Sequence, residues 1–134
     1  MMMSAGPMRG LCVATFRWMV TAAYTAVITT ISLTPNRSLR RFMVSWEFPN
    51  RDKCLHFLMY GVLAVLLTWA LQLHAVKSRT RLLVAISCAA YGLAVEILQV
   101  LVLPGDRMFS AWDAVANLAG AACAIVALGA IRRD

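Results

Sequence analysis

The sequence predicts an all-α integral membrane protein: a bundle of four transmembrane helices in a single domain over residues 1–134. Two observations predict this class. The chain is 61% hydrophobic and only 14% charged, which is far more apolar than an average soluble domain. It also contains four apolar stretches of roughly 20 residues, the length that a helix needs to cross a bilayer, at 11–33, 54–73, 82–103 and 111–131. The short connections favour antiparallel neighbours.

The first stretch, 11–33, has two interpretations. A signal peptide would use Arg9 as its charged N-terminal region, but the apolar part exceeds the usual length of about 7–15 residues and no A-x-A cleavage site closes it. We therefore favour an uncleaved first helix. Arg17 lies inside this helix near one end, from where its long side chain can reach the membrane surface.

Between the first two helices, the spacing predicts a short amphipathic helix. Leu39, Phe42, Met43 and Trp46 fall at i, i+3, i+4 and i+7, which is one face of a helix. Such a helix would lie in the membrane interface. The alternative is an irregular loop with scattered apolar residues.

The net charge of +7 would suit a nucleic-acid-binding protein, but the hydropathy excludes a soluble protein of that kind. Lys and Arg divide almost evenly between the two sides of the predicted bundle, so the positive-inside rule hardly sets the orientation. The compact basic loop at 77–81 is typical of a cytoplasmic connector. We therefore expect both termini in the cytoplasm.

The cysteines indicate neither a metal site nor a cofactor. Cys12, Cys54, Cys88 and Cys123 lie in separate helices without a CxxC pair, and no H-x-x-x-H spacing occurs. From the sequence we expect no metal and no cofactor.

Polar residues inside the apolar stretches mark the candidate site, because an ionisable group in a bilayer is costly and usually faces a partner or a cavity. The second and fourth helices begin on the side where the third helix ends. Tyr60, Glu96 and Asn117 each lie seven residues from that side, which places them at one depth, roughly 10 Å below the surface. This common depth predicts a shared pocket.

The spacing of the polar residues along each helix also predicts a shared pocket, as their common depth does. Residues at i and i+3 or i+4 share a helix face, so each of three helices carries one polar stripe that opens to the same surface. The stripes are Asp52, His56 and Tyr60; Glu96 and Gln99; and Asp113, Asn117 and Gly120. Their convergence is a prediction, because it depends on how the helices are rotated.

Several of these residues also have a purely structural interpretation. Ser110 and Asp113 fit a capping box at the start of the fourth helix, and Asn50 can cap the second. Asn117 can simply hold helices together by hydrogen bonding. Glu96 is harder to explain in this way: it lies about two turns inside its helix, so its carboxyl group must be paired, protonated or hydrated.

The motifs resemble those of one family. Asp52-Lys53-x-x-His56-Phe57-x-x-Tyr60 resembles the first signature of VanZ-like membrane proteins. Glu96-x-x-Gln99, followed by Pro104, Arg107, Ser110, Asp113, Asn117 and Gly120, resembles the second. The exit of the first helix, Ser32-Leu33-Thr34-Pro35, is also similar. The resemblance covers nearly the whole chain after residue 10 and no motif position is broken.

This resemblance implies a small multi-pass protein of the bacterial inner membrane. The family takes its name from a protein associated with resistance to teicoplanin. The resemblance implies no agreed reaction. It does imply a set of site residues. His56 and Glu96 would be the catalytic candidates, and the binding candidates are Asp52, Lys53, Tyr60, Gln99, Arg107, Ser110, Asp113 and Asn117.

Two functions fit these residues. Two helix N-termini with Lys53 and Arg107 beside them suit an anion, and the abundant anions at a bilayer are lipid phosphates. The first hypothesis is therefore a cell-envelope protein that binds or processes an anionic lipid-linked head group, with His56 and Glu96 as acid/base groups if it is an enzyme. The second is a non-catalytic assembly protein, whose polar residues only order the bundle. The sequence leaves enzyme activity and homo-oligomerisation open, and a transporter is a distant third.

Overall fold

The computed structural model of the protein describes residues 6–35, 38, 50–71, 78–106 and 108–131. Over these residues the fold is all-α. The helices are α1 (Gly6–Ser32), α3 (Arg51–Ala70), α4 (Ser78–Val102) and α5 (Ala111–Ile131). All four are long and apolar enough to cross a membrane, which confirms the predicted class.

The helix bounds differ from the predicted ones mainly at the starts of α1, α3 and α4, which lie five, three and four residues earlier than predicted. The starts of α3 and α4 have a common reason. Their first turns contain charged residues, such as Asp52 and Arg79, that the apolar stretches at 54–73 and 82–103 left out. Apolarity marks the part of a helix that lies in lipid, whereas the backbone hydrogen bonds continue into the interface. The amphipathic helix predicted around Leu39 to Trp46 lies outside the described residues.

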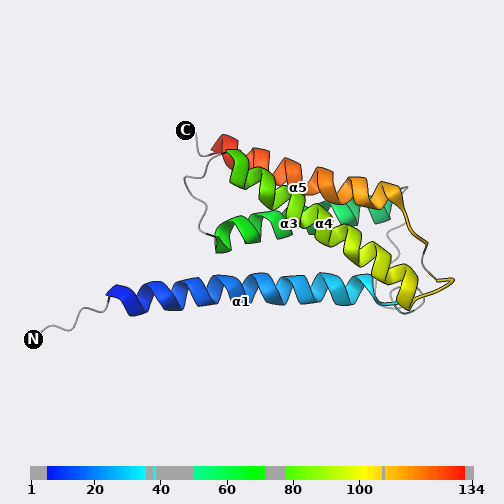
Figure 1. Cartoon of the computed structure of the whole chain (residues 1–134), viewed down its shortest axis with the longest axis horizontal. Coiled ribbons are helices and arrows are strands. Elements are labelled where there is room, and N and C mark those ends of the chain that lie inside the picture. The colour runs from blue at the N-terminus through cyan, green and yellow to red at the C-terminus, as the bar shows by residue number, and fades with distance from the viewer. Residues whose placement is uncertain (1–5, 36–37, 39–49, 72–77, 107, 132–134) are drawn as a thin grey trace, which may run out of the picture.

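The helices run up and down in chain order (Figure 1). α3, α4 and α5 lie together, and α1 lies along one side of that group. The start of α1 and the end of α5 are at the same end of the bundle. The opposite end, here called the polar end, holds the starts of α3 and α5 and the end of α4.

Small residues allow α3 and α5 to approach each other closely. A Cβ atom added to Gly61 would lie 3.3 Å from the carbonyl oxygen of Gly120, and one added to Gly120 would collide with the carbonyl oxygen of Phe57. Ala64 and Ala121 are both completely buried beside them. Close backbone approach through small residues is a common way for helices to pack within a membrane.

Polar side chains attach α1 to the other helices. Thr21 donates to the Leu66 carbonyl oxygen at 3.3 Å, and Tyr24 donates to that of Met59 at 3.1 Å. The Arg17 guanidinium lies over the Trp69 ring, 5.4 Å from its centroid. Trp69 is in the last turn of α3, so Arg17 lies at the end of the bundle opposite to the polar end.

Candidate functional site

His56 lies at the centre of a buried polar cluster near the polar end. Its Nδ1 atom is 3.0 Å from Asn117 Oδ1, and its Nε2 atom is 3.7 Å from Glu96 Oε1. An amide oxygen only accepts hydrogen bonds. Nδ1 of His56 therefore carries the hydrogen and donates the hydrogen bond to Asn117 Oδ1. Nε2 then faces the carboxyl group. One helix supplies each partner: α3 gives His56, α4 gives Glu96 and α5 gives Asn117.

Two polar atoms of this cluster are buried without a hydrogen-bond partner. They are Glu96 Oε1 and Asn117 Nδ2, and the two residues are only 1% and 0% exposed. Leaving a buried polar atom unpaired costs roughly 1–3 kcal/mol. Packing alone would not favour two buried polar atoms that lack hydrogen-bond partners. We therefore interpret Glu96 Oε1 and Asn117 Nδ2 as groups that interact with a ligand.

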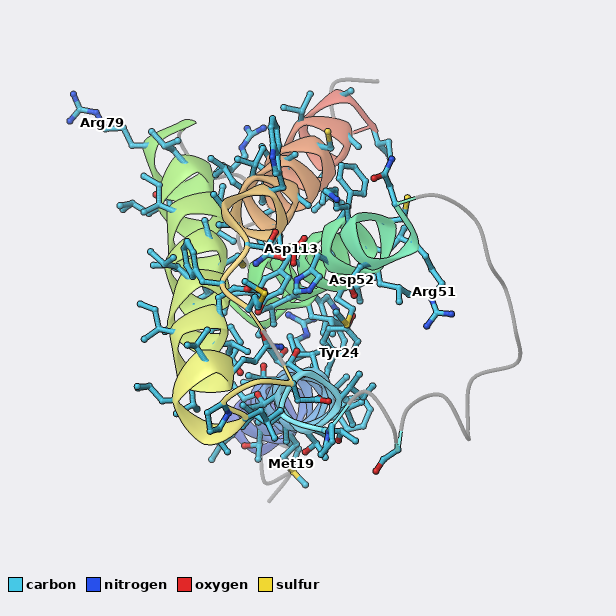
Figure 2. All side chains as sticks on the ribbon, turned by 90° about the vertical axis from the view of Figure 1, so that its right-hand side faces the viewer. Met19, Tyr24, Arg51, Asp52, Arg79 and Asp113 are labelled. Carbon is cyan, nitrogen blue, oxygen red and sulfur yellow. The ribbon has the colours of Figure 1, made fainter. Side chains whose placement is uncertain are left out.

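Two further carboxylates lie beside His56. One ligand atom each from Asp52, His56 and Asp113 can be chosen so that all three lie within 4.8 Å of one another. Figure 2 views the bundle from the polar end and shows Asp52 and Asp113 between α3, α4 and α5, whereas Arg51 points away from them.

Asp52, His56, Glu96, Asp113 and Asn117 are referred to below as the polar cluster. His56 and Asp113 are buried, and Asp52 is exposed. The cluster therefore begins at the surface of the polar end, with Asp52, and extends inward to Glu96 and Asn117. It contains three acids and one imidazole, a composition that favours protons or cations.

Ser110 connects the start of α5 to the cluster. Its Oγ atom accepts a hydrogen bond from the Asp113 backbone N–H at 3.3 Å, which is the first half of the predicted capping box.

Replacing Ser110 with alanine is expected to lower the free energy of unfolding by about 1 kcal/mol, because α5 loses its N-terminal side-chain cap. Thermal unfolding of the purified protein in detergent would measure the loss. Ser110→Thr keeps the hydroxyl group and is expected to retain most of the stability. Equal stability of Ser110→Ala and the wild type would contradict the cap.

Of the two residues of the predicted basic clamp, the structure describes only Lys53. Lys53 Nζ donates to Asn50 Oδ1 at 3.4 Å, at the start of α3, and Arg107 lies outside the described residues. Asn50 was also expected to cap α3, and that prediction is wrong in detail. Asn50 occupies the N-cap position with a left-handed backbone, φ 63°, but its side chain makes no capping hydrogen bond.

Of two further predicted site residues, Tyr60 lies beside His56 and Gln99 does not. Gln99 is buried and donates to the Ser32 carbonyl oxygen at 2.8 Å, so it satisfies an acceptor in the last turn of α1 and does not join His56. Tyr60 does join it: the rings of Tyr60 and His56 are parallel, with centroids 6.4 Å apart. Tyr60 also contacts the ring of Tyr91 at 6.3 Å.

Gly92 belongs to the site and was missed from the sequence. A Cβ atom at this position would lie 2.5 Å from Asn117 Nδ2 and 2.9 Å from a ring carbon of Tyr60. The absent side chain makes room for both residues. The sequence does contain a signal for this role of Gly92. Gly92 lies four residues before Glu96 and therefore on the same face of the helix.

Comparison with protein families agrees with these motifs. The profile described as VanZ/LLP1 matches residues 10–132. The chain belongs to the VanZ/LLP1 family. This confirms the resemblance drawn from the motifs in α3, α4 and α5, and it makes the chain a multi-pass membrane protein of that family. Comparisons with curated proteins and with solved structures give no match.

This member of the VanZ/LLP1 family has an open groove of about 490 Å³ between α1, α3 and α4. The α1 side of the groove runs from Trp18 to Thr29, and Tyr91 of α4 lies at the same groove. Thr21, Thr25 and Thr29 line it, but their hydroxyl groups donate to carbonyl oxygens one turn earlier in α1. Their methyl groups therefore contribute to a mainly apolar lining.

The groove and the polar cluster are neighbours. Tyr91 lines the groove and hydrogen-bonds to Thr29. The Tyr91 ring neighbours that of Tyr60, and the Tyr60 ring lies parallel to that of His56, with 6.4 Å between their centroids. An apolar surface along the spans thus adjoins a buried acid–imidazole group near the polar end.

Proposed function

We propose that this protein binds an anionic lipid-linked head group in the bacterial inner membrane, with both termini in the cytoplasm. The observation that carries the proposal is the apolar groove beside the polar cluster. The head group would lie at the polar end, and its hydrocarbon chain would lie in the groove.

The dimensions of the groove suit a hydrocarbon chain. Its α1 side covers Trp18 to Thr29, a length of about 16 Å at the rise of an α-helix. This is about half the thickness of a bilayer hydrocarbon core. A single acyl or polyprenyl segment can therefore lie along α1 while its head group stays near the interface.

The chemistry at the polar end suits a head group that exchanges protons or is held through positive partners. His56 faces Glu96 through Nε2, so these two residues are the candidates for acid/base chemistry if the protein processes its ligand. Lys53, at the start of α3, and Arg107, between α4 and α5, are basic residues that the sequence places near this end. An envelope precursor as ligand would connect the protein to teicoplanin-type glycopeptide resistance.

One observation favours a second candidate, a non-catalytic protein in which polar contacts only order the helices. The Gln99 contact to Ser32 and the Tyr24 contact to Met59 both join separate helices, and none of these four residues lines the groove. This candidate predicts that apolar replacement of the whole polar cluster at matched volume is tolerated.

Filling the groove tests the first candidate. Ala22 lines the groove, and Ala22→Trp would occupy part of its volume. If the indole displaces two methylene groups of a bound chain, about 1.6 kcal/mol of burial is lost, which corresponds to roughly tenfold weaker binding. Native mass spectrometry and lipid extraction of the purified protein would measure the co-purifying lipid.

Ala23→Trp is the matched control, since Ala23 is an exposed neighbour on α1 that is not part of the groove lining. It is expected to keep the wild-type amount of lipid. An unchanged lipid content in Ala22→Trp, or an equal loss in both variants, would remove the groove from the proposal.

A further inference from the structure

We propose that Asp52, His56 and Asp113 form a binding site for one divalent metal cation, Zn²⁺ or Mn²⁺, with Glu96 as a further ligand. No metal was expected from the sequence, because metal motifs are recognised there as histidines or cysteines close together in one segment. Here Asp52 and His56 come from one turn of α3, and Asp113 comes from the start of α5.

The separations fit a common ligand sphere. One ligand atom each from Asp52, His56 and Asp113 lies within 4.8 Å of the others. Nitrogen and oxygen ligands about 2.0–2.2 Å from a metal lie roughly 3.3–4.4 Å from one another. Two ligand atoms at the full 4.8 Å would have to approach each other by roughly 0.4–1.5 Å to share one cation, a movement that side-chain rotation can supply.

Glu96 is an independent observation that points to a ligand. Its Oε1 atom is buried, has no hydrogen-bond partner and lies 3.7 Å from His56 Nε2. The ion-pair partner that the structure shows for Glu96 is the His56 imidazole. A bound cation would offset the charge of the carboxylates in the polar cluster and give Oε1 a direct partner.

The hydrogen bond of His56 prepares its ring for a metal. Nδ1 donates to Asn117 Oδ1 at 3.0 Å, which leaves Nε2 as the ring atom that can coordinate. Metal-binding histidines commonly donate their other N–H to a carbonyl or carboxylate oxygen in this way. Asn117 would therefore be a positioning residue, and it is completely buried.

The ligand types indicate which cations fit. Carboxylate oxygens alone would favour Mg²⁺ or Ca²⁺, whereas an imidazole nitrogen shifts the preference towards Zn²⁺ and Mn²⁺. Asp52 is exposed, so a hydrated ion can reach the site from the surface of the polar end. A cation would also give a head-group phosphate a positive partner; that last link rests on the proposed function, whereas the cation site itself does not.

Direct metal binding tests the site. The protein, purified in detergent with a tag that contains no histidines and stripped with EDTA, would be titrated with Zn²⁺ alone and with Mn²⁺ alone. Equilibrium dialysis with elemental analysis, and the electron paramagnetic resonance signal of free Mn²⁺, would measure binding. We expect saturation at about one ion per chain for at least one of these cations, and a higher unfolding temperature in its presence.

Variants of the proposed ligands, compared with matched controls, test where the cation binds. Asp52→Asn is the most direct variant, because Asp52 is exposed and its replacement leaves the buried core intact. Asp52→Asn, His56→Asn and Asp113→Asn should each bind the ion at least about tenfold more weakly, in the range seen when the surroundings of metal sites are changed. His74→Asn, at the other histidine of the chain, and Asp106→Asn should bind as the wild type does.

Two results would overturn the cation site: no saturable binding of either ion by the wild type, or unchanged affinity in Asp52→Asn. The second result suffices even if the buried variants do not fold. Co-purifying lipid is measured separately before and after EDTA. Metal binding without lipid would refute only the proposed function, and lipid without metal binding would refute only this inference.

Discussion

Gly120→Ala is expected to lower the free energy of unfolding by more than about 3 kcal/mol, at or beyond the upper end of the usual cost of overpacking. The added Cβ atom would collide with the carbonyl oxygen of Phe57 in α3. A flexible side chain could rotate away, but this neighbour is backbone, so α3 and α5 would have to separate. Asn117, one turn before Gly120, would then move away from His56.

Thermal unfolding in detergent, with the helical circular dichroism signal as the readout, would measure this effect. Gly10→Ala is the matched control, because a Cβ atom at Gly10 meets nothing within 4 Å. Alanine is favoured over glycine inside a helix by about 1 kcal/mol, so the control should be as stable as the wild type or more so. Similar behaviour of both variants would show that α3 and α5 do not pack through Gly120.

His56→Leu is expected to destabilise the protein by about 1–3 kcal/mol, the usual cost of leaving a buried polar group without its partner. Leucine offers no polar contact to Glu96 and cannot donate a hydrogen bond to Asn117. The buried Glu96 carboxyl group and the Asn117 amide oxygen would both lose the contact that the structure shows for them.

The double variant His56→Leu/Glu96→Leu should recover much of this loss, because it removes the buried acid together with its partner. A double-mutant cycle on these two positions would give the coupling energy between them. A positive coupling above about 1 kcal/mol is the expected result. Strictly additive effects would mean that His56 and Glu96 do not interact, and would remove the centre of the polar cluster.

The sequence was sufficient for the class of the protein, and it also predicts one depth for three of its polar residues. Hydropathy over about 20 residues predicted four spans, and these are the four helices found. The rise per residue placed Tyr60, Glu96 and Asn117 at one level. Both are local properties of a helix, so they can be read without knowing its neighbours. The helix starts were less accurate, because charged first turns do not register as apolar.

The partners of each residue required the tertiary structure. Gln99 shares a helix face with Glu96, yet Gln99 contacts the end of α1 and Glu96 faces His56. Lys53 follows Asp52 directly, yet it contacts Asn50. Spacing along one helix says which residues share a face, but it does not say which helix lies opposite that face.

The sequence alone therefore determined a four-span membrane protein with acids, an imidazole and an amide near one end. Only the tertiary structure decided that Asp52, His56 and Asp113 form one group and that a groove adjoins it. The physical reason is helix rotation, which close packing at Gly61 and Gly120 fixes between α3 and α5. Contacts between distant parts of the chain set that rotation, and no local pattern of residues encodes it.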